Sequence, residues 1–321
     1  MDERVSLRVL VTGANGFVGR AVCAHLSSLN HHVVAAVRAN RLVIQAHRTF
    51  IVDSLSQDTD WHAVLQGVDA VIHLAARVHI VKDRHAQPLA EFRRINVAAT
   101  LQLARQTAAA GVKRFVFLST AKVNGEFSLP GQSFRESDVP NPQDAYGLSK
   151  YEAEQGLVQI AAATNMEVVI VRPPLVYGPG VKANFAALMN WVARGWPLPL
   201  GAVDNCRSLV AIDNLVEFVA ICLTHPDAAN QIFFVSDRQD LSTTALAHAI
   251  ADVAGVRAHL LTVPVPLLMS LARILGKGPA AQRLCQNLQI DTTKAVTLLG
   301  WAPKVSVRQA LKGTVLARGM A

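Results

Sequence analysis

Tyr146 and Lys150 stand four residues apart in the segment D-A-Y-G-L-S-K-Y-E. Side chains at this spacing lie on the same face of an α-helix, so the phenol and the ammonium can be directed at one point. An ammonium next to a phenol favours the phenolate, so we expect the pKa of Tyr146 to be lowered. Such a pair can exchange a proton with a bound molecule near neutral pH.

A glycine-rich turn near the N-terminus is the second feature of the sequence that could bind a ligand. Gly13, Gly16 and Gly19 form the pattern G-x-x-G-x-x-G between a predicted strand and a predicted helix. Glycines at this spacing allow a tight turn and a close approach of the backbone to a pyrophosphate at a helix N-terminus. We therefore expect a dinucleotide to bind here, and the alternative is an ordinary glycine-rich turn. The other residues of the turn expected to contact it are Asn15, Phe17 and Val18.

The end of the second predicted strand bears on which dinucleotide binds. NAD-binding proteins usually place an acid there for the ribose 2′-hydroxyl, whereas an arginine accommodates a 2′-phosphate. Here the strand ends at Val37, and Arg38 and Arg41 follow with no acid nearby. We therefore favour NADP(H) over NAD(H), with a solvated loop residue as the alternative for Arg38. Asp53 and Ser54 follow the third strand, where Asp53 either accepts a hydrogen bond from the adenine amino group or is a turn residue.

Predicted strands and helices alternate along the first half of the chain, and these elements must position the residues named above. Short apolar segments predict strands at 7–11, 32–37, 50–52, 70–75, 114–118 and 167–171, and helical spacing covers 17–29, 89–110 and 146–164. Continuous apolar strands between helices predict an α/β fold, a doubly wound parallel sheet of the Rossmann type. Ligands bind such sheets at the carboxyl ends of the strands, where each motif lies.

Prolines and glycines divide the second half into shorter elements. We expect residues 1–175 to form an NAD(P)-binding Rossmann domain that carries the catalytic residues. Residues 176–321 are expected to form mainly a smaller, C-terminal substrate-binding lobe, with a return segment to the main sheet near 207–223. The apolar segment 263–275 is interpreted as a buried or pocket-lining helix, and a membrane-surface helix is the alternative.

The composition excludes several classes of protein. The 321 residues are 51% hydrophobic, which is enough for a large core and unlike a disordered chain. The net charge of +8 comes from dispersed basic residues, so we expect anionic nucleotides as ligands and no nucleic acid. Without a signal peptide or an apolar run that could span a bilayer, a cytoplasmic protein with no stable membrane insertion is predicted. The cysteines and histidines lack metal-ligand spacing, so no metal site is expected.

Further segments match one known family along nearly the whole chain. They include T-G-A-N-G-F-V-G from Thr12, H-L-A-A from His73, Y-G-L-S-K from Tyr146 and R-P-P-L-V-Y-G-P-G from Arg172. Together they resemble the extended short-chain dehydrogenase/reductase family, of the NAD-dependent epimerase/dehydratase type. This resemblance implies an enzyme that acts on a nucleotide sugar.

The resemblance also implies roles for individual positions. Tyr146 would be the catalytic acid/base, Lys150 would lower its pKa and hold the nicotinamide ribose, and Thr120 would hydrogen-bond the reacting sugar oxygen. Ser119 is the alternative to Thr120. Further cofactor contacts would come from Leu74, Ala75, Ala76, Asn96, Pro173 and Pro174. The residues implied for the substrate are Arg77, Asn184, Leu200 and Arg207.

Two of these arginines have alternative interpretations. The guanidinium of Arg207 suits a diphosphate, and a structural salt bridge at the surface is the less favoured alternative. Arg77 either reaches the substrate diphosphate or caps a helix.

The same machinery supports two reactions at C4 of a UDP-sugar. We favour reduction of a UDP-2-acetamido-2,6-dideoxy-4-ketohexose by NAD(P)H, because Arg38 favours an exchangeable NADPH. The segments L-S-T-A-K-V-N-G from Leu118 and P-L-P-L-G-A-V-D-N from Pro197 are also similar to enzymes of bacterial surface-polysaccharide (O-antigen) synthesis. The alternatives are a UDP-hexose or UDP-N-acetylhexosamine 4-epimerase with tightly bound NAD, and a non-catalytic protein that senses NADP(H). A dehydratase is disfavoured, because Ala121 and Lys122 follow Thr120 where a glutamate would be needed. The resemblance further implies a homodimer formed through the helices at 89–110 and 146–164.

Overall fold

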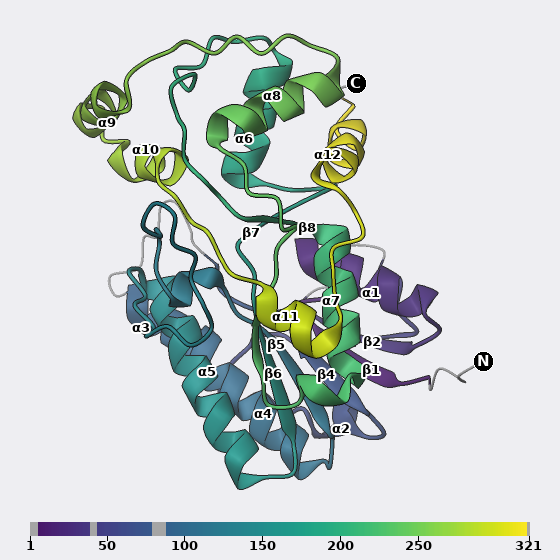
Figure 1. The fold of residues 1–321 in the computed structure, drawn as a ribbon. Coiled ribbons are helices and arrows are strands. Elements are labelled where there is room, and N and C mark those ends of the chain that lie inside the picture. The colour runs from purple at the N-terminus through teal and green to yellow at the C-terminus, as the bar shows by residue number, and fades with distance from the viewer. Residues whose placement is uncertain (1–5, 39–43, 79–87, 320–321) are drawn as a thin grey trace.

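A parallel sheet of seven strands forms the larger part of the protein in the computed structural model, which describes residues 6–38, 44–78 and 88–319 (Figure 1). The strands run in the order β3-β2-β1-β4-β5-β6-β9, and all neighbours are parallel. Their bounds are β1 (Arg8–Thr12), β2 (His32–Val37), β3 (Arg48–Ile51), β4 (Ala70–His73), β5 (Arg114–Leu118), β6 (Glu167–Arg172) and β9 (Ile232–Phe234). The strand order reverses between β1 and β4, which confirms the predicted doubly wound Rossmann-type sheet and places its ligand crevice there.

Helices cover both faces of this sheet with two separate apolar cores. One face carries α1 (Phe17–Ser28), α7 (Ile212–Thr224) and α11 (Thr293–Leu299). The other carries α2 (His62–Leu65), α4 (Ala99–Ala109) and α5 (Ala145–Ala163). The central strands β1, β2, β4, β5 and β6 are buried on both sides and consist mostly of Val, Ile, Leu, Ala and Phe, which is why they could be predicted from the sequence.

The long helix predicted at 89–110 is interrupted. It consists of α3 (Pro88–Phe92), a π-helical segment η1 (Arg93–Ala98) and α4. The wider turn of η1 contains Asn96, whose side chain is buried. Single π-helical turns inside longer helices are frequent at functional sites.

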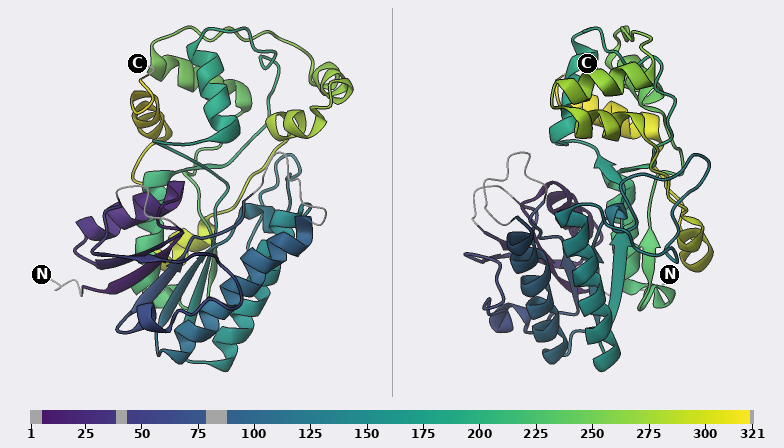
Figure 2. Two further views of the ribbon diagram at one scale, coloured as in Figure 1. Left: turned by 180° about the vertical axis from the view of Figure 1, so that it is seen from behind. Right: turned by 90° about the vertical axis from the view of Figure 1, so that its left-hand side faces the viewer.

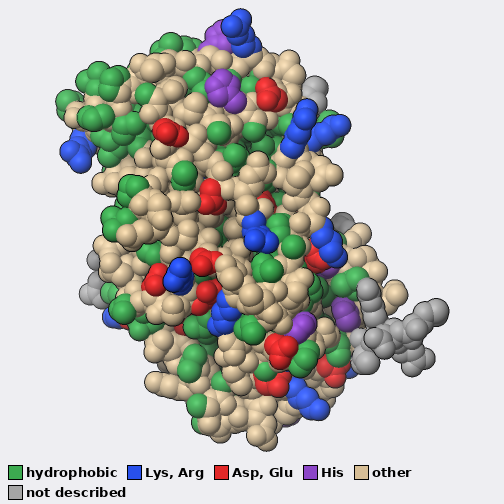
Figure 3. Space-filling model, in the orientation of Figure 1, with side chains coloured by type: hydrophobic (Ala, Val, Ile, Leu, Met, Phe, Trp, Pro, Cys, Tyr) green, Lys and Arg blue, Asp and Glu red, His purple; other side chains and the backbone are tan. Residues whose placement is uncertain are grey.

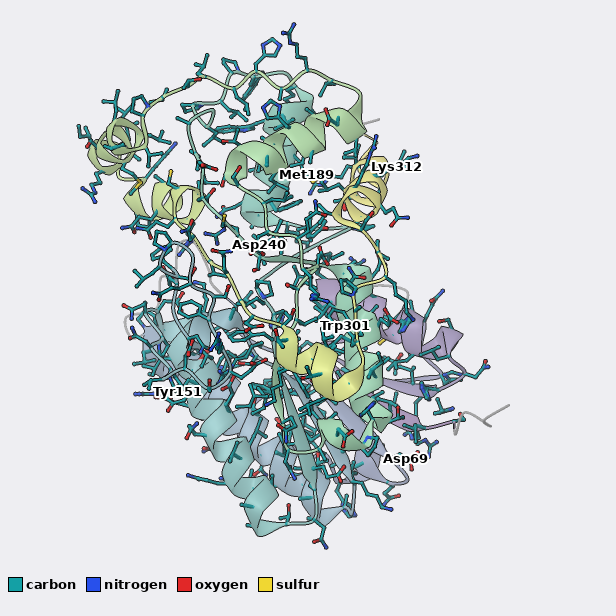
Figure 4. All side chains as sticks on the ribbon, viewed as in Figure 1. Asp69, Tyr151, Met189, Asp240, Trp301 and Lys312 are labelled. Atoms are coloured by element: carbon teal, nitrogen blue, oxygen red, sulfur yellow. The ribbon has the colours of Figure 1, made fainter. Side chains whose placement is uncertain are left out.

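The remaining elements form a lobe at the end of the molecule that lies beyond the strand termini (Figures 1 and 2). Its core is made by α6 (Ala183–Ala193), α8 (Thr243–Ala254) and α12 (Val307–Leu316), and Met189 of α6, labelled in Figure 4, is fully buried there. Below them β7 (Leu175–Tyr177) pairs in parallel with β8 (Leu209–Ala211). Helices α9 (Val265–Ile274) and α10 (Gly278–Cys285) complete the lobe. In the larger part, η2 (Ala121–Val123) follows β5 and η3 (Pro226–Ala228) lies between α7 and β9.

The chain returns to the main sheet more often than predicted. Helix α7 packs against α1 in the expected return segment, but β9 also pairs with β6, and α11 packs against β9. The helix predicted at 263–275 exists as α9. None of its side chains is buried, but Leu268 and Ala272 line a cavity, so the expectation of a buried or pocket-lining helix is met in its second form. Among the described residues, no helix is long and apolar enough to cross a membrane.

Candidate active site

Asp144 fixes the start of the helix that carries Tyr146 and Lys150. Its Oδ1 accepts a hydrogen bond of 2.7 Å from the Gly147 backbone N–H, so it caps α5. Its Oδ2 accepts a hydrogen bond of 2.5 Å from Lys122 Nζ, which also donates to Glu126. The cap and its ion pair therefore set the position of the first turn of α5.

The Lys150 ammonium is buried beneath this turn. Its Nζ donates a hydrogen bond of 2.7 Å to the Leu118 carbonyl oxygen and lies 4.2 Å from the centre of the Phe117 ring. Burial lowers the pKa of Lys150 to about 7, while the negative charge of Glu154 on the next turn opposes that shift. Lys150 can therefore change its protonation state near neutral pH.

The pKa of Tyr146 moves opposite to the predicted direction. Burial raises it, and the nearby Asp144 carboxylate raises it further. The sequence indicated the ammonium of Lys150 but not the extent to which the phenol is removed from water. In this structure the Tyr146 hydroxyl keeps its proton near neutral pH and is available as a donor.

A buried network behind the site distinguishes Ser119 from Thr120. The Ser119 hydroxyl donates to Glu154, which also receives a hydrogen bond of 3.0 Å from Arg172 Nε. Arg172 Nη1 in turn donates to Asn124 Oδ1 over 2.9 Å. Because the Ser119 side chain is engaged in this network, Thr120 is the hydroxyl that lines the cavity described below.

The glycine turn fits a dinucleotide for geometric reasons. Gly13 has a φ of +67°, and a Cβ there would lie 2.8 Å from the Ala75 backbone nitrogen. A Cβ on Gly19 would lie 2.1 Å from the Gly13 carbonyl oxygen, which is far inside contact distance. The first turn of α1 has no side-chain cap, so its backbone N–H groups are available to a pyrophosphate.

A chain of hydrogen bonds holds the loop after β4 next to this turn. His73 bonds through Nδ1 to Thr12 Oγ1 at 2.7 Å and through Nε2 to Thr100 Oγ1 at 2.9 Å. Thr12 Oγ1 also accepts from the Ala75 N–H at 3.3 Å. These contacts hold Leu74 and Ala75 directly beside Gly13, and Ala76 follows them.

Asn96 acts on the same loop through its amide. Its Oδ1 accepts a hydrogen bond from the Arg77 N–H at 2.7 Å, and its Nδ2 donates to the Arg77 carbonyl and to Ser149, both at 3.0 Å. The side chain that we predicted to bind the cofactor is therefore used to join the loop after β4 to α5.

The other predicted cofactor residues lie at the carboxyl ends of three strands. Arg38 follows β2 and is exposed, as are Asp53 and Ser54 after β3. Arg41 lies outside the described residues. Pro173 follows β6 and is buried, and its carbonyl accepts a hydrogen bond of 2.9 Å from Ala121.

A cavity of about 630 Å³ joins the catalytic residues to the lobe. Thr120, Tyr146 and Pro174 line it from the main sheet. The predicted substrate residues that line it from the other side are Asn184, Leu200 and Arg207. Arg77, also predicted for the substrate, is not part of this lining.

Positive charge collects at the lobe end of the cavity. Arg207 Nη1 donates a hydrogen bond of 2.9 Å to the Gln286 carbonyl oxygen. Arg283 and Lys277 also line the cavity. Burial and the neighbouring Arg283 both lower the pKa of Arg207, and the carboxylate of Glu126, which also lines the cavity, opposes this shift. Arg207 forms no salt bridge with any described carboxylate, which disfavours the structural alternative. This end of the cavity therefore suits a ligand with two or more negative charges.

Lys277 and Arg283 lie in a segment whose charge pattern is visible in the sequence. Residues 253–290 include Arg257, Arg273, Lys277 and Arg283 but no aspartate or glutamate. A segment of one charge sign is a candidate for contact with an anionic partner.

Comparison with known proteins identifies the family. The model of the NAD dependent epimerase/dehydratase family matches residues 9–235. The chain belongs to this family. As a member of the NAD dependent epimerase/dehydratase family it is an enzyme, in line with the sequence-based resemblance.

The proteins to which the chain is similar differ in the reactions that their names give. The chain is 40% identical to a UDP-glucose 4-epimerase of Vibrio cholerae over 98% of its own length and 97% of the relative. It is 26% identical to a GDP-6-deoxy-D-mannose reductase of Pseudomonas aeruginosa, with 95% of each chain covered. The fold matches a UDP-glucuronic acid 4-epimerase of Bacillus cereus in complex with NAD, with a TM-score of 0.77, 22% identity and coverage of 98% and 99%.

Proposed function

We propose that the protein is an NADPH-dependent reductase that acts at C4 of a UDP-sugar, with a UDP-2-acetamido-2,6-dideoxy-4-ketohexose as substrate. The observation that carries the reductase over the epimerase is the end of β2. The strand ends at the apolar Val37, and the exposed Arg38 follows it. A guanidinium at this point favours a 2′-phosphate and therefore an exchangeable NADPH.

The residues at the cavity would have different roles in this reaction. The protonated Tyr146 hydroxyl donates its proton to the C4 oxygen of the sugar, and Thr120 hydrogen-bonds the same oxygen. The positive charge of Lys150, when protonated, stabilises the negative charge that develops on the phenol. The nicotinamide, when bound, supplies the hydride.

The far end of the cavity would hold the nucleotide half of the substrate. Arg207 and Arg283 are placed to pair with the diphosphate, whose charge matches two guanidinium groups. Asn184 and Leu200 lie on the same side of the cavity and would contact the uridine.

A second candidate is a UDP-hexose 4-epimerase with tightly bound NAD. The 40% identity to the Vibrio cholerae UDP-glucose 4-epimerase over nearly both chains favours it. Both reactions use Tyr146, Lys150 and Thr120 in the same positions. They differ in whether the cofactor leaves after one hydride transfer.

The nucleotide retained by the purified protein separates the two candidates. Denaturation followed by mass spectrometry is expected to release less than one equivalent of nucleotide per chain, and the protein should then bind NADPH more tightly than NADH. Release of stoichiometric NAD would contradict the reductase proposal and support the epimerase.

Three wider expectations also remain proposals. We propose that the protein works in the cytoplasm in the synthesis of a surface polysaccharide such as O-antigen. We further propose that it forms a homodimer through the outer faces of α4 and α5. Sedimentation equilibrium of the purified chain tests the dimer, since a single species with the mass of one chain would contradict it.

A further inference from the structure

Helix α9 carries an apolar face that no other described element covers. The helix has no buried side chain. Leu267, Leu271 and Ile274 lie on one face by their spacing and are 60%, 53% and 82% exposed, and Leu275 at the helix end is 63% exposed. We call these four residues the α9 patch. Figure 3 shows hydrophobic side chains gathered over this helix at the upper left of the molecule.

The opposite side of α9 has a different role. Leu268 and Ala272 line the cavity that contains Tyr146, and the helix packs against α10. The α9 patch therefore lies on the outside of a cavity wall. A contiguous group of large aliphatic side chains in water marks an interaction surface, because exposing them is unfavourable.

The charge around the patch indicates what kind of surface covers it. Residues 253–290 contain four basic residues and no acidic one, and Arg273 within α9 and Lys277 just after it are exposed. Such a surface attracts an anionic partner. A second copy of this chain placed patch to patch would bring the same positive charge, which disfavours self-association through α9.

We propose that the α9 patch docks reversibly on an anionic phospholipid bilayer. An apolar helix face flanked by Arg and Lys is the pattern of a helix that lies in the plane of the membrane interface. The four aliphatic side chains would enter the boundary between head groups and acyl chains, while Arg273 pairs with a lipid phosphate. With ten residues α9 is too short to span a bilayer, so the association is peripheral.

Docking in this way places the cavity wall at the membrane surface. The inference does not depend on which sugar or cofactor the site uses, because no residue of the α9 patch lines the cavity. The docking and the proposed function can therefore fail separately.

Co-sedimentation with vesicles tests the docking. The purified full-length protein is mixed with vesicles of phosphatidylglycerol and phosphatidylethanolamine, or of phosphatidylcholine alone. We expect binding to the anionic vesicles that weakens with added salt, and much weaker binding to phosphatidylcholine. Leu271→Asp should reduce binding at least about tenfold, because it replaces an inserted aliphatic side chain by a charge. Arg273→Gln should reduce it about fivefold.

Leu316→Asp is the matched control. Leu316 ends α12 and is 56% exposed, close to the 53% of Leu271, but it lies outside the α9 patch. This variant should bind anionic vesicles like the unchanged protein. Equal melting temperatures of all variants would show that folding is intact, and Arg273→Gln keeps the test informative if Leu271→Asp is unstable.

Three results would overturn the proposal. The first is no binding of the unchanged protein to anionic vesicles, and the second is equal binding by the unchanged protein and both α9 variants. The third is concentration-dependent self-association, measured by sedimentation velocity, that Leu271→Asp abolishes while vesicles bind nothing. That result would assign the patch to a second copy of the chain.

Discussion

Burial moves the pKa values of Tyr146 and Lys150 in opposite directions. It raises that of the phenol and lowers that of the ammonium to about 7. A phenol that keeps its proton is suited to donate it to a ketone oxygen as that oxygen gains electrons. The Tyr146 phenol therefore keeps its proton near neutral pH, as an ordinary phenol does, and can act as a proton donor.

Replacement of Tyr146 by phenylalanine tests this role directly. Tyr146→Phe should lower kcat about 100- to 10,000-fold, since general acid catalysis contributes that much. Binding of the cofactor should change little, and a fluorescence titration with NADPH measures it beside steady-state turnover. Tyr151→Phe removes a hydroxyl from the next turn of α5, away from the cavity lining, and should keep normal turnover. Full turnover in Tyr146→Phe would refute the assignment.

The residue types of the site could be predicted from the sequence, but their environments could not. Tyr146, Lys150 and the glycines stand in short segments whose spacing carries the chemistry. The choice of Thr120 over Ser119 depends on Glu154, which is distant in sequence and meets Ser119 only in the folded chain. The raised pKa of Tyr146 likewise depends on burial, which no local pattern records.

At the scale of elements, one buried ion pair joins α5 to β6. Glu154 and Arg172 have side chains that are 1% and 2% exposed. Glu154→Gln leaves the guanidinium without a compensating charge, so we expect the free energy of unfolding to fall by about 3–5 kcal/mol. Urea unfolding at neutral pH measures the change.

The same helix offers a matched control for that experiment. Glu152 pairs with Arg93 on the solvent side of α5, where the Arg93 side chain is 51% exposed. Glu152→Gln should change stability little, because water screens such pairs. Equal effects of the two substitutions would contradict the importance of the buried pair.

His73 at the end of β4 should make the protein sensitive to acid. Burial lowers its pKa from 6.5 to about 3, so the folded state holds the neutral ring between Thr12 and Thr100. Below pH 6.5 the unfolded chain binds a proton that the folded chain does not, and stability falls with pH until about pH 3. The expected slope from this group is about 1.4 kcal/mol per pH unit.

Urea unfolding at several pH values measures this slope. The variant His73→Gln lacks the titrating ring and should show a shallower dependence between pH 6.5 and 4.5, a window inside the range set by the two pKa values. An unchanged slope in the variant would show that other groups cause the acid sensitivity.

Long apolar elements were predictable from the sequence, and short or interrupted ones were not. β2 and β5 have the predicted bounds because each is a continuous apolar run. β9 has only three residues and becomes a strand by pairing with β6. The π-helical turn η1 and the exposed position of α9 depend on tertiary contacts that hydrophobic spacing does not reveal.

At the scale of the molecule, the site exists because the lobe lies against the strand ends. Thr120 and Tyr146 come from the sheet side, whereas Arg207 and Arg283 reach the same cavity from the lobe. The sequence showed the first pair through local motifs. Arg283 was missed because its role depends on how α10 is placed over the cavity.

The cavity is compatible with both the reductase and the epimerase reaction. The two reactions differ in where the hydride comes from and where it goes. A reductase transfers hydride once and releases the oxidised cofactor. An epimerase takes hydride from C4 and returns it to the same carbon, without exchange with free cofactor. The distinction is therefore visible in the product and does not require a structure.

The most direct test is to supply NADPH carrying deuterium at the transferable position of the nicotinamide together with a UDP-4-keto-sugar. Mass spectrometry and NMR of the product should find one deuterium at C4, with one NADPH consumed per sugar. Interconversion of UDP-glucose and UDP-galactose with no deuterium in the sugar and no net consumption of NADPH would contradict the proposed reduction.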